Sequence, residues 1–240
     1  MNGVTNINSN FPDGVTNNYL NTLLGSMGQL DPSVYHSYFN DFDTYTAGNW
    51  TITATGAATE ALTNENGGSL LITNTAGNGD LASLQLVPSS FALTAGVPAF
   101  FKARFKLSDA NLSNFSIGLQ AANTTPFTVV NGIIFYKNSG STAVNLGIVS
   151  ASAVQTAPNN FAAISATYVT VGFYFDGTVI NYFGSSDTST TSSSRNPTRL
   201  GTITPTNLPV GALTLSISLS NGAAIAKTAT VDYIFAATQR

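Results

Sequence analysis

The stretch 168–183 constrains the fold of this chain most, because it contains two β-strands joined by a tight turn. In its first half, every second residue from Val169 to Phe175 is a large apolar residue, which is the two-residue period of a pleated strand. Asp176-Gly177 follows directly, and Asp-Gly between two β-rich runs is a strong hairpin signal. A two-residue loop would pair Phe175 with Thr178. Both faces of this hairpin carry apolar residues, so we predict that it lies centrally in a larger β-structure.

From residue 38 onward the chain shows further short strands, which are separated by turn signals. A series of this kind, without long helical runs, predicts an all-β fold, an antiparallel β-sandwich. The further predicted strands are Trp50–Thr55, Ser69–Asn74, Leu81–Val87, Phe100–Leu107, Phe115–Gln120, Gly132–Tyr136, Val144–Ser150, Leu213–Leu219 and Thr228–Ala236.

Residues 1–37 differ from the rest and predict a mostly extended N-terminal arm, followed by one β-sandwich domain at 38–240. Gly25 would end a helix that begins near Thr16 or Asn17 after about two turns, and so short a helix is not stable alone. The arm therefore packs either on its own domain or on a partner. The residues that we expect to contact a partner are Tyr19, Leu20, Leu23, Leu24 and Met27.

The composition excludes several classes of protein. Charged residues make up 8% of the chain, and the eight Lys and Arg residues accompany a net charge of −3. Binding to nucleic acid needs a basic surface, so we predict no nucleic-acid partner. There is no cysteine for disulfides. No apolar run is long enough to span a bilayer and the N-terminus shows no signal-peptide pattern, so we predict no membrane partner.

The residue types that common catalytic sites need are scarce. His36 is the only histidine and lies near the arm, so we expect neither a Ser-His-Asp set nor a histidine-based zinc site. Glu60 and Glu65 are the only glutamates, and they flank the predicted hairpin tip LTNEN. The aspartates do not form a calcium-binding loop. We therefore predict no catalytic residues, no metal ligands, no cofactor and no enzymatic activity.

Two groups of side chains allow alternative interpretations. Lys102, Arg104 and Lys106 lie on one face of a strand, where they either meet an acidic neighbour or keep that face soluble, and we favour the second. The aromatic residues of the central hairpin could stack on sugar rings. We favour a core position for them, because aromatic side chains dominate protein cores. They are Phe173, Tyr174, Phe175, Tyr182 and Phe183.

The order of motifs resembles the concanavalin A-like (LamG-like) jelly-roll domains of structural proteins of tailed bacteriophages, including capsid decoration or cement proteins. The resemblance covers residues 38–240. It rests mainly on the hairpin VTVGFYFDGTVINYF at 169–183 and on the ending VDYI at 231–234. In the lectin and glucanase branches, function rests on a metal-binding Asp/Asn cluster or on an acidic catalytic strand. This sequence carries neither at matching places, so the resemblance does not imply sugar binding or hydrolysis.

The resemblance implies a capsid decoration protein that binds the major capsid protein and clamps neighbouring subunits. Its location would be the outside of the virion, after assembly in the host cytoplasm. We further predict a homotrimer, because phage shells offer threefold positions and the neutral faces of the strand 213–219 could pack against a twin. The alternative is a receptor- or glycan-binding module of a phage head or tail fibre.

Overall fold

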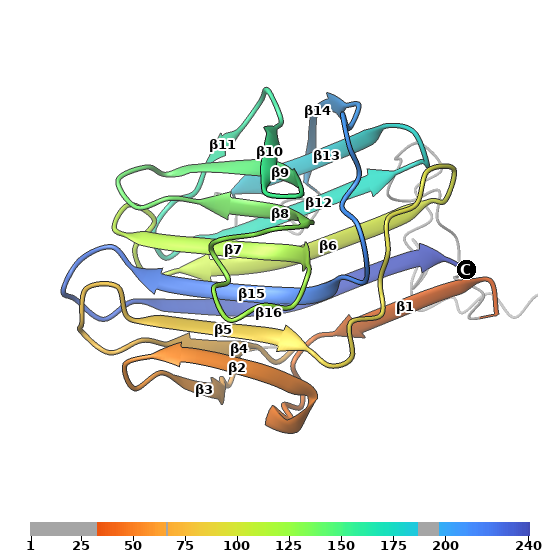
Figure 1. The fold of residues 1–240 in the computed structure, drawn as a ribbon. Coiled ribbons are helices and arrows are strands. Elements are labelled where there is room, and N and C mark those ends of the chain that lie inside the picture. Colours follow the sequence, from red (N-terminus) through yellow and green to blue (C-terminus); the bar gives the residue numbers. More distant parts are fainter. Residues whose placement is uncertain (1–32, 66, 187–196) are drawn as a thin grey trace, which may run out of the picture.

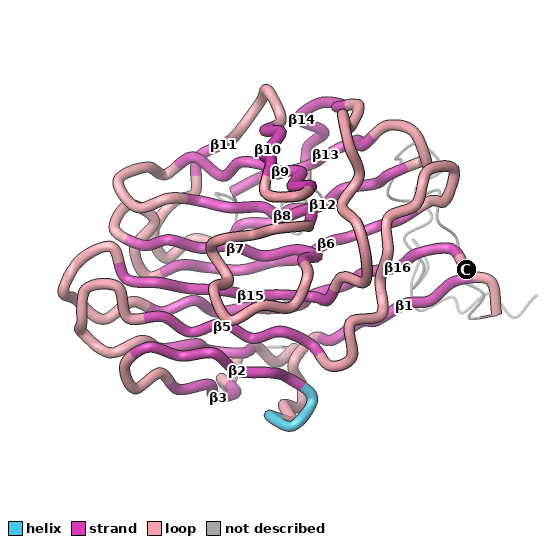
Figure 2. The backbone as a smooth tube through the Cα atoms, in the orientation of Figure 1, coloured by secondary structure: helices cyan, strands magenta, loops and turns pink. Residues whose placement is uncertain are grey.

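The computed structural model describes residues 33–65, 67–186 and 197–240, and these form two antiparallel sheets packed face to face (Figure 1). Figure 2 shows that this part of the chain consists almost entirely of strands and loops. One short helical element is present there, the 3₁₀ turn η1 (Ala47–Asn49). No helix in the described ranges has the length and hydrophobicity needed to cross a bilayer. The predicted all-β sandwich is confirmed.

The back sheet contains the central hairpin. Across this sheet the strands are β14 (Thr198–Ile203), β13 (Ile180–Ser186), β12 (Tyr168–Phe175), β6 (Ala99–Leu107), β16 (Thr228–Gln239), β4 (Leu70–Thr73) and β3 (Thr59–Leu62). A further strand, β1 (Tyr35–Asn40), pairs with the second half of β16.

The front sheet covers the other side of the core (Figure 1). Across this sheet the strands are β10 (Ala153–Thr156), β9 (Ala143–Ser150), β8 (Gly132–Lys137), β7 (Ser113–Gln120), β15 (Thr214–Asn221), β5 (Leu81–Leu86) and β2 (Trp50–Thr55). The two-residue strand β11 (Phe161–Ala162) pairs with the beginning of β9.

Aromatic rings from both sheets fill the core between them. Phe101 of β6 stacks on Phe173 of the neighbouring strand β12 and on Phe135 of the opposite sheet, with ring centroids 5.7 and 6.3 Å apart. Phe105 of β6 meets Phe115 of β7 at 4.3 Å. The predicted alternation in β6 therefore places Phe101 and Phe105 in the core, where they contact aromatic rings of both sheets.

The central hairpin has the predicted strands and faces, but the predicted register is wrong. Phe175 pairs with Ile180 instead of Thr178, so the loop has four residues, 176–179. The carboxylate of Asp176 causes this change, because its Oδ1 accepts hydrogen bonds of 2.8 Å from the backbone N–H groups of Thr178 and Val179. Since the shift is two residues, the same side chains still face the core.

The residues predicted to form the partner-binding surface of the arm, Tyr19, Leu20, Leu23, Leu24 and Met27, lie outside the described residues. The boundary predicted between residues 37 and 38 falls within β1, which pairs with β16 along its whole length. The homotrimer stays a prediction. However, Ser216 and Ser218 of β15, on the face assigned to a trimer contact, are buried within the chain.

Deleting the ring of Phe173 should test the core. The Phe173→Ala variant should lower the free energy of unfolding by about 3–5 kcal/mol, because the ring is fully buried. Phe39→Ala is the matched control, since Phe39 is 59% exposed and its loss should cost less than about 1 kcal/mol. Denaturant unfolding of both variants measures the difference. Equal losses would contradict the assigned core.

Gly177 offers a test of the hairpin loop. It has a φ of +101°, and an added Cβ would lie 2.7 Å from backbone atoms of Gly96. Gly177→Ala should therefore destabilise the protein by more than about 1–2 kcal/mol, which is the cost of the backbone conformation alone. Gly48→Ala is the control, because nothing lies within 4 Å of a Cβ there. If thermal unfolding shows the two variants to be equally stable, the observed loop geometry is wrong.

Candidate functional site

A groove of about 540 Å³ opens on the outer face of the front sheet. Strands β7, β8 and β9 form its floor, and its sides are the segment 127–129 and the beginning of β10. Its lining residues within the described part of the chain are Asn114, Ser116, Phe127, Thr128, Val129, Ile134, Tyr136, Asn138, Gly147, Val149, Ser152 and Val154. None of them is charged.

Tyr136 provides an aromatic surface on the floor of the groove. Its side chain starts on β8, crosses β9 at Gly147 and reaches β10, where its hydroxyl lies 3.3 Å from Oγ1 of Thr156. An added Cβ on Gly147 would lie 3.0 Å from Cε1 of Tyr136, so a glycine leaves space for the ring. A side chain that spans three strands in this way must lie along the sheet surface. One face of the ring is then available to a ligand.

Amide and hydroxyl groups gather at one end of the groove. Asn114 of β7 and Asn138, directly after β8, both line it together with Ser116. The backbone N–H of Ser139 donates a 2.9 Å hydrogen bond to Oδ1 of Asn114. This contact fixes the side chain of Asn114, and an asparagine amide offers both donors and acceptors to a ligand.

The rim of the groove is apolar. Phe127 is 40% exposed and Val154 is 58% exposed, on the two sides of the groove. The backbone N–H of Ser152 donates a 2.8 Å hydrogen bond to the carbonyl of Val130, which ties the β7–β8 segment to the turn before β10. Exposed apolar side chains beside a few polar groups are typical of a ligand-binding surface.

A second depression of about 300 Å³ lies beyond Val154, which lines both hollows. Gln155 of β10 lines this depression and is hydrogen-bonded to the segment after β14, which lines it as well. Its Nε2 donates to the carbonyl of Thr204 at 2.9 Å, and its Oε1 accepts from the N–H of Thr206 at 2.7 Å. Ile148 and Ser150 line this second depression and lie on the opposite face of β9 from Gly147 and Val149, so the depression is separate from the groove.

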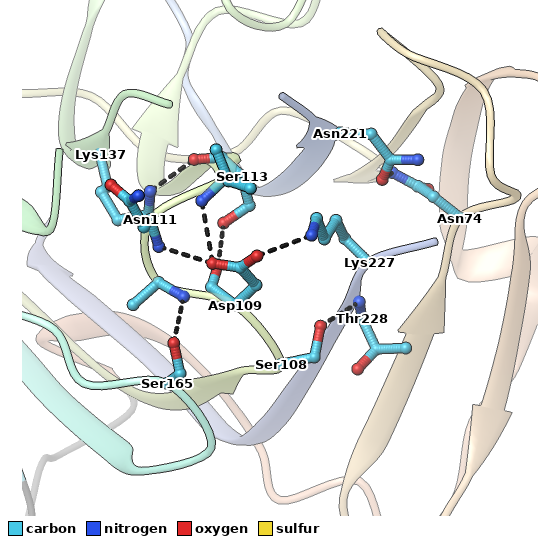
Figure 3. Close-up of polar contacts among 12 residues, drawn as sticks. Asn74, Ser108, Asp109, Asn111, Ser113, Lys137, Ser165, Asn221, Lys227 and Thr228 are labelled. Carbon is cyan, nitrogen blue, oxygen red and sulfur yellow. Dashed lines mark hydrogen bonds and ion pairs between the residues drawn. The ribbon is translucent and has the colours of Figure 1, made fainter. Parts of the chain in front are cut away.

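A polar network supports the polar end of the groove (Figure 3). Asp109, between β6 and β7, accepts 2.8 and 2.9 Å hydrogen bonds from the N–H groups of Asn111 and Leu112. Its other oxygen forms a 2.7 Å ion pair with Lys227, between β15 and β16. The hydrogen bond from Lys227, with smaller contributions from Leu112 and Asn111, lowers the pKa of Asp109 from 3.8 to about 2. The ion pair therefore links the β6–β7 connection to the β15–β16 connection, and both of these run from one sheet to the other.

The structure places the other residues that the sequence singled out away from the groove. Phe173 and Tyr182 are fully buried, as the favoured core interpretation predicts. Glu65 lies between β3 and β4 on the back sheet and forms a 2.8 Å ion pair with Lys106. Arg104 is buried and pairs with Asp232 of β16, so the favoured interpretation of the basic strand face as a solvated surface was wrong, and the alternative of acidic neighbours is the one observed. Within the described residues, no group of three His, Asp or Glu side chains is arranged to hold a metal ion.

Sequence reasoning missed the groove, although it located every strand of its floor. Tyr136, Gly147 and Val154 come from three different strands, and Phe127 comes from a loop. No local pattern joins them. The alternation in β8 was the one available signal, because it places Tyr136 on the face opposite to the core residue Phe135.

Comparison with known proteins identifies the fold. No family model matches the sequence, and no curated protein matches it. Among solved structures, a protein of unknown function from Shewanella oneidensis is 16% identical, with a TM-score of 0.59 over 88% of this chain and 95% of that one. The β-glucanase of Bacillus licheniformis is 14% identical, with a TM-score of 0.56 over 83% and 96%. The potassium-bound carbohydrate recognition domain of Emp46p is 10% identical, with a TM-score of 0.52 over 82% and 94%.

These matches show a concanavalin A-like jelly roll, as the resemblance implies. They do not indicate a bacteriophage origin. They also correct the prediction that the chain is not an enzyme, because several solved structures with this fold are glycosidic hydrolases or β-glucanases. That prediction was wrong because it considered only familiar residue sets and gave no weight to the activities that this fold supports.

The ion pair between Asp109 and Lys227 predicts a specific response to acid. The pKa of Asp109 is lower in the folded protein than its usual value, so the pair stabilises the fold above about pH 4 and this contribution is lost as the pH falls to about 2. A double-mutant cycle with Asp109→Asn and Lys227→Met should therefore give a favourable coupling energy at about pH 7 that shrinks at about pH 2. Thermal unfolding of the four proteins measures it. A coupling that does not change with pH would contradict the ion pair.

Proposed function

We propose that this protein binds a neutral glycan in the groove of the front sheet. The observation that carries the proposal is the combination of an accessible aromatic ring, Tyr136, with amide groups of Asn114 and Asn138 at one end and no charged lining residue among those described. A pyranose ring has one face of C–H groups, which packs on an aromatic ring, and hydroxyl groups at its edge, which pair with amides.

The chemistry of the lining also indicates which ligands fit poorly. A phosphate or carboxylate group would lose its water without gaining a cationic partner in this groove, and burial of an unpaired charge is costly. A purely apolar ligand would offer no hydrogen bond to the amide groups of Asn114 and Asn138 at the polar end. A neutral polyhydroxylated chain satisfies both parts of the surface.

The solved structures that share this fold support the proposal in a general way. They include the carbohydrate recognition domains of Emp46p and Emp47p and several β-glucanases. At 10 to 14% identity, these likenesses concern the fold alone. The proposal therefore rests on the groove of this chain, and the neighbours indicate that the fold accommodates glycans.

The capsid decoration role stays a prediction from the resemblance. Its contact residues in the arm lie outside the described residues, and no comparison indicates a capsid. The predicted alternative, a glycan-binding module, agrees better with the groove. For this reason the groove carries the proposed function.

Binding should depend on Tyr136. We expect the protein to bind one of the neutral β-linked gluco-, xylo- or manno-oligosaccharides, measured by calorimetry. Tyr136→Ala should weaken that binding by about tenfold, as expected for the loss of one stacking contact. Tyr174→Ala is the matched control, because Tyr174 lies with the outer aromatic cluster of the back sheet. The same mixtures are assayed for new reducing ends, since hydrolases share this fold.

Two results would contradict the proposal. One is the absence of binding to every neutral oligosaccharide tested, with or without binding to charged hexuronate oligomers. The other is an equal loss of affinity in the Tyr136 and Tyr174 variants, which would move the binding site away from the groove.

A further inference from the structure

Lys137 is a buried lysine whose ammonium group lies in a cage of backbone oxygens. It is the last residue of β8 and is 1% exposed. Its Nζ donates hydrogen bonds to three carbonyl oxygens, those of Ser113, Asn138 at 3.3 Å and Ser141 at 3.1 Å. Figure 3 shows the contact with Ser113 beside the Asp109 network. An ammonium has three N–H donors, so each donor has one acceptor.

This cage adjoins the polar end of the groove. Ser113 directly precedes Asn114, and Asn138 itself supplies one of the carbonyl oxygens. The Nζ atom of Lys137 therefore joins the beginning of β7 to the turn 138–141. Those two segments carry the two amide side chains of the groove, and the hydrogen bond from Ser139 to Asn114 joins them a second time.

We propose that Lys137 is a positioning residue, whose ammonium group holds Asn114 and Asn138 in the arrangement that binds the edge of a sugar ring. This inference rests on the proposed glycan-binding function. Lys137 does not line the groove, so it acts through the two segments that its ammonium joins. Its role is that of a built-in cation, which binds three carbonyl oxygens at once.

The charge of Lys137 determines whether the cage is complete. A neutral amine has two N–H donors and a lone pair, so one of the three carbonyl oxygens would lose its donor and face that lone pair. The charged groups that face Lys137 from the packed segments are Asp109 and, paired with it, Lys227. Burial lowers the pKa of Lys137 from 10.5 to about 8, and the Asp109 carboxylate opposes part of this change.

Stability and binding should consequently respond to pH in opposite directions. Because the pKa of Lys137 is lower in the folded protein than in the unfolded chain, its penalty for burial is present below about pH 8 and is relieved as the pH rises towards about 10.5. The contribution of this residue to stability therefore increases with pH. Glycan binding should decrease over the same range, since the cage opens. General unfolding would lower both.

The test measures glycan affinity and melting temperature together, from about pH 6 to about pH 9.5. The parent protein should lose affinity by about fivefold across about pH 8, the loss expected when one polar contact is misplaced, without a matching drop in melting temperature. Lys137→Met should bind weakly at every pH. Lys106→Met, on the outer face of the back sheet, is the matched control and should keep the parent pH profile. An affinity of the parent that is constant over this range would overturn the inference.

Two further measurements cover the remaining outcomes. If Lys137→Met does not fold, the pH profile of the parent decides alone, together with an NMR titration of the Lys137 Cε resonance, which must follow the same midpoint. If the parent binds no glycan, the proposed function fails. The side-chain amide resonances of Asn114 and Asn138 then test the positioning role by themselves. They should shift with the titration of Lys137, and resonances that do not move would overturn it.

Discussion

The sandwich depends on the aromatic contacts that β6 makes with both sheets. Phe101 and Phe105 reach across the core to β8 and β7. Phe135, which packs against Phe101, is followed in the sequence by Tyr136. One face of β8 therefore lies in the core, and its other face lines the groove. Because the rings fill the core, the two faces of β8 have separate functions. The inner face packs in the core between the sheets, and the outer face lines the groove.

Much of the fold could be predicted, because an alternation of apolar and polar residues indicates both a strand and the face of that strand that is buried. The strand 50–55 was predicted with its observed bounds, and the alternation from residue 100 to 107 correctly identified the core face, although Arg104 on the opposite face is also buried. The hairpin register was not predictable from the Asp-Gly pair, since the carboxylate of Asp176 binds two backbone N–H groups and lengthens the loop. A local rule for turns does not include this competition by a side chain.

The candidate site was much less predictable, because it depends on which strands become neighbours. Gly147 and Thr156 have no special pattern in the sequence, and their importance appears only when β8, β9 and β10 lie side by side. Lys137 is the clearest case. A lysine at the end of a strand normally indicates a solvated surface, yet three carbonyl oxygens from two segments make its burial feasible.

The pairing of β1 with β16 has a mechanical consequence. Tyr35 pairs with Gln239, and the N–H of Arg240 donates to the carbonyl of Val34 at 2.9 Å, so the beginning of β1 and the end of β16 lie together in an antiparallel pair. A force that pulls these two points apart loads the hydrogen bonds one after another, like the opening of a zipper. A shearing force would load them all at once. If the protein is tethered through both points, β1 will peel away first, while the groove on the other sheet keeps its shape.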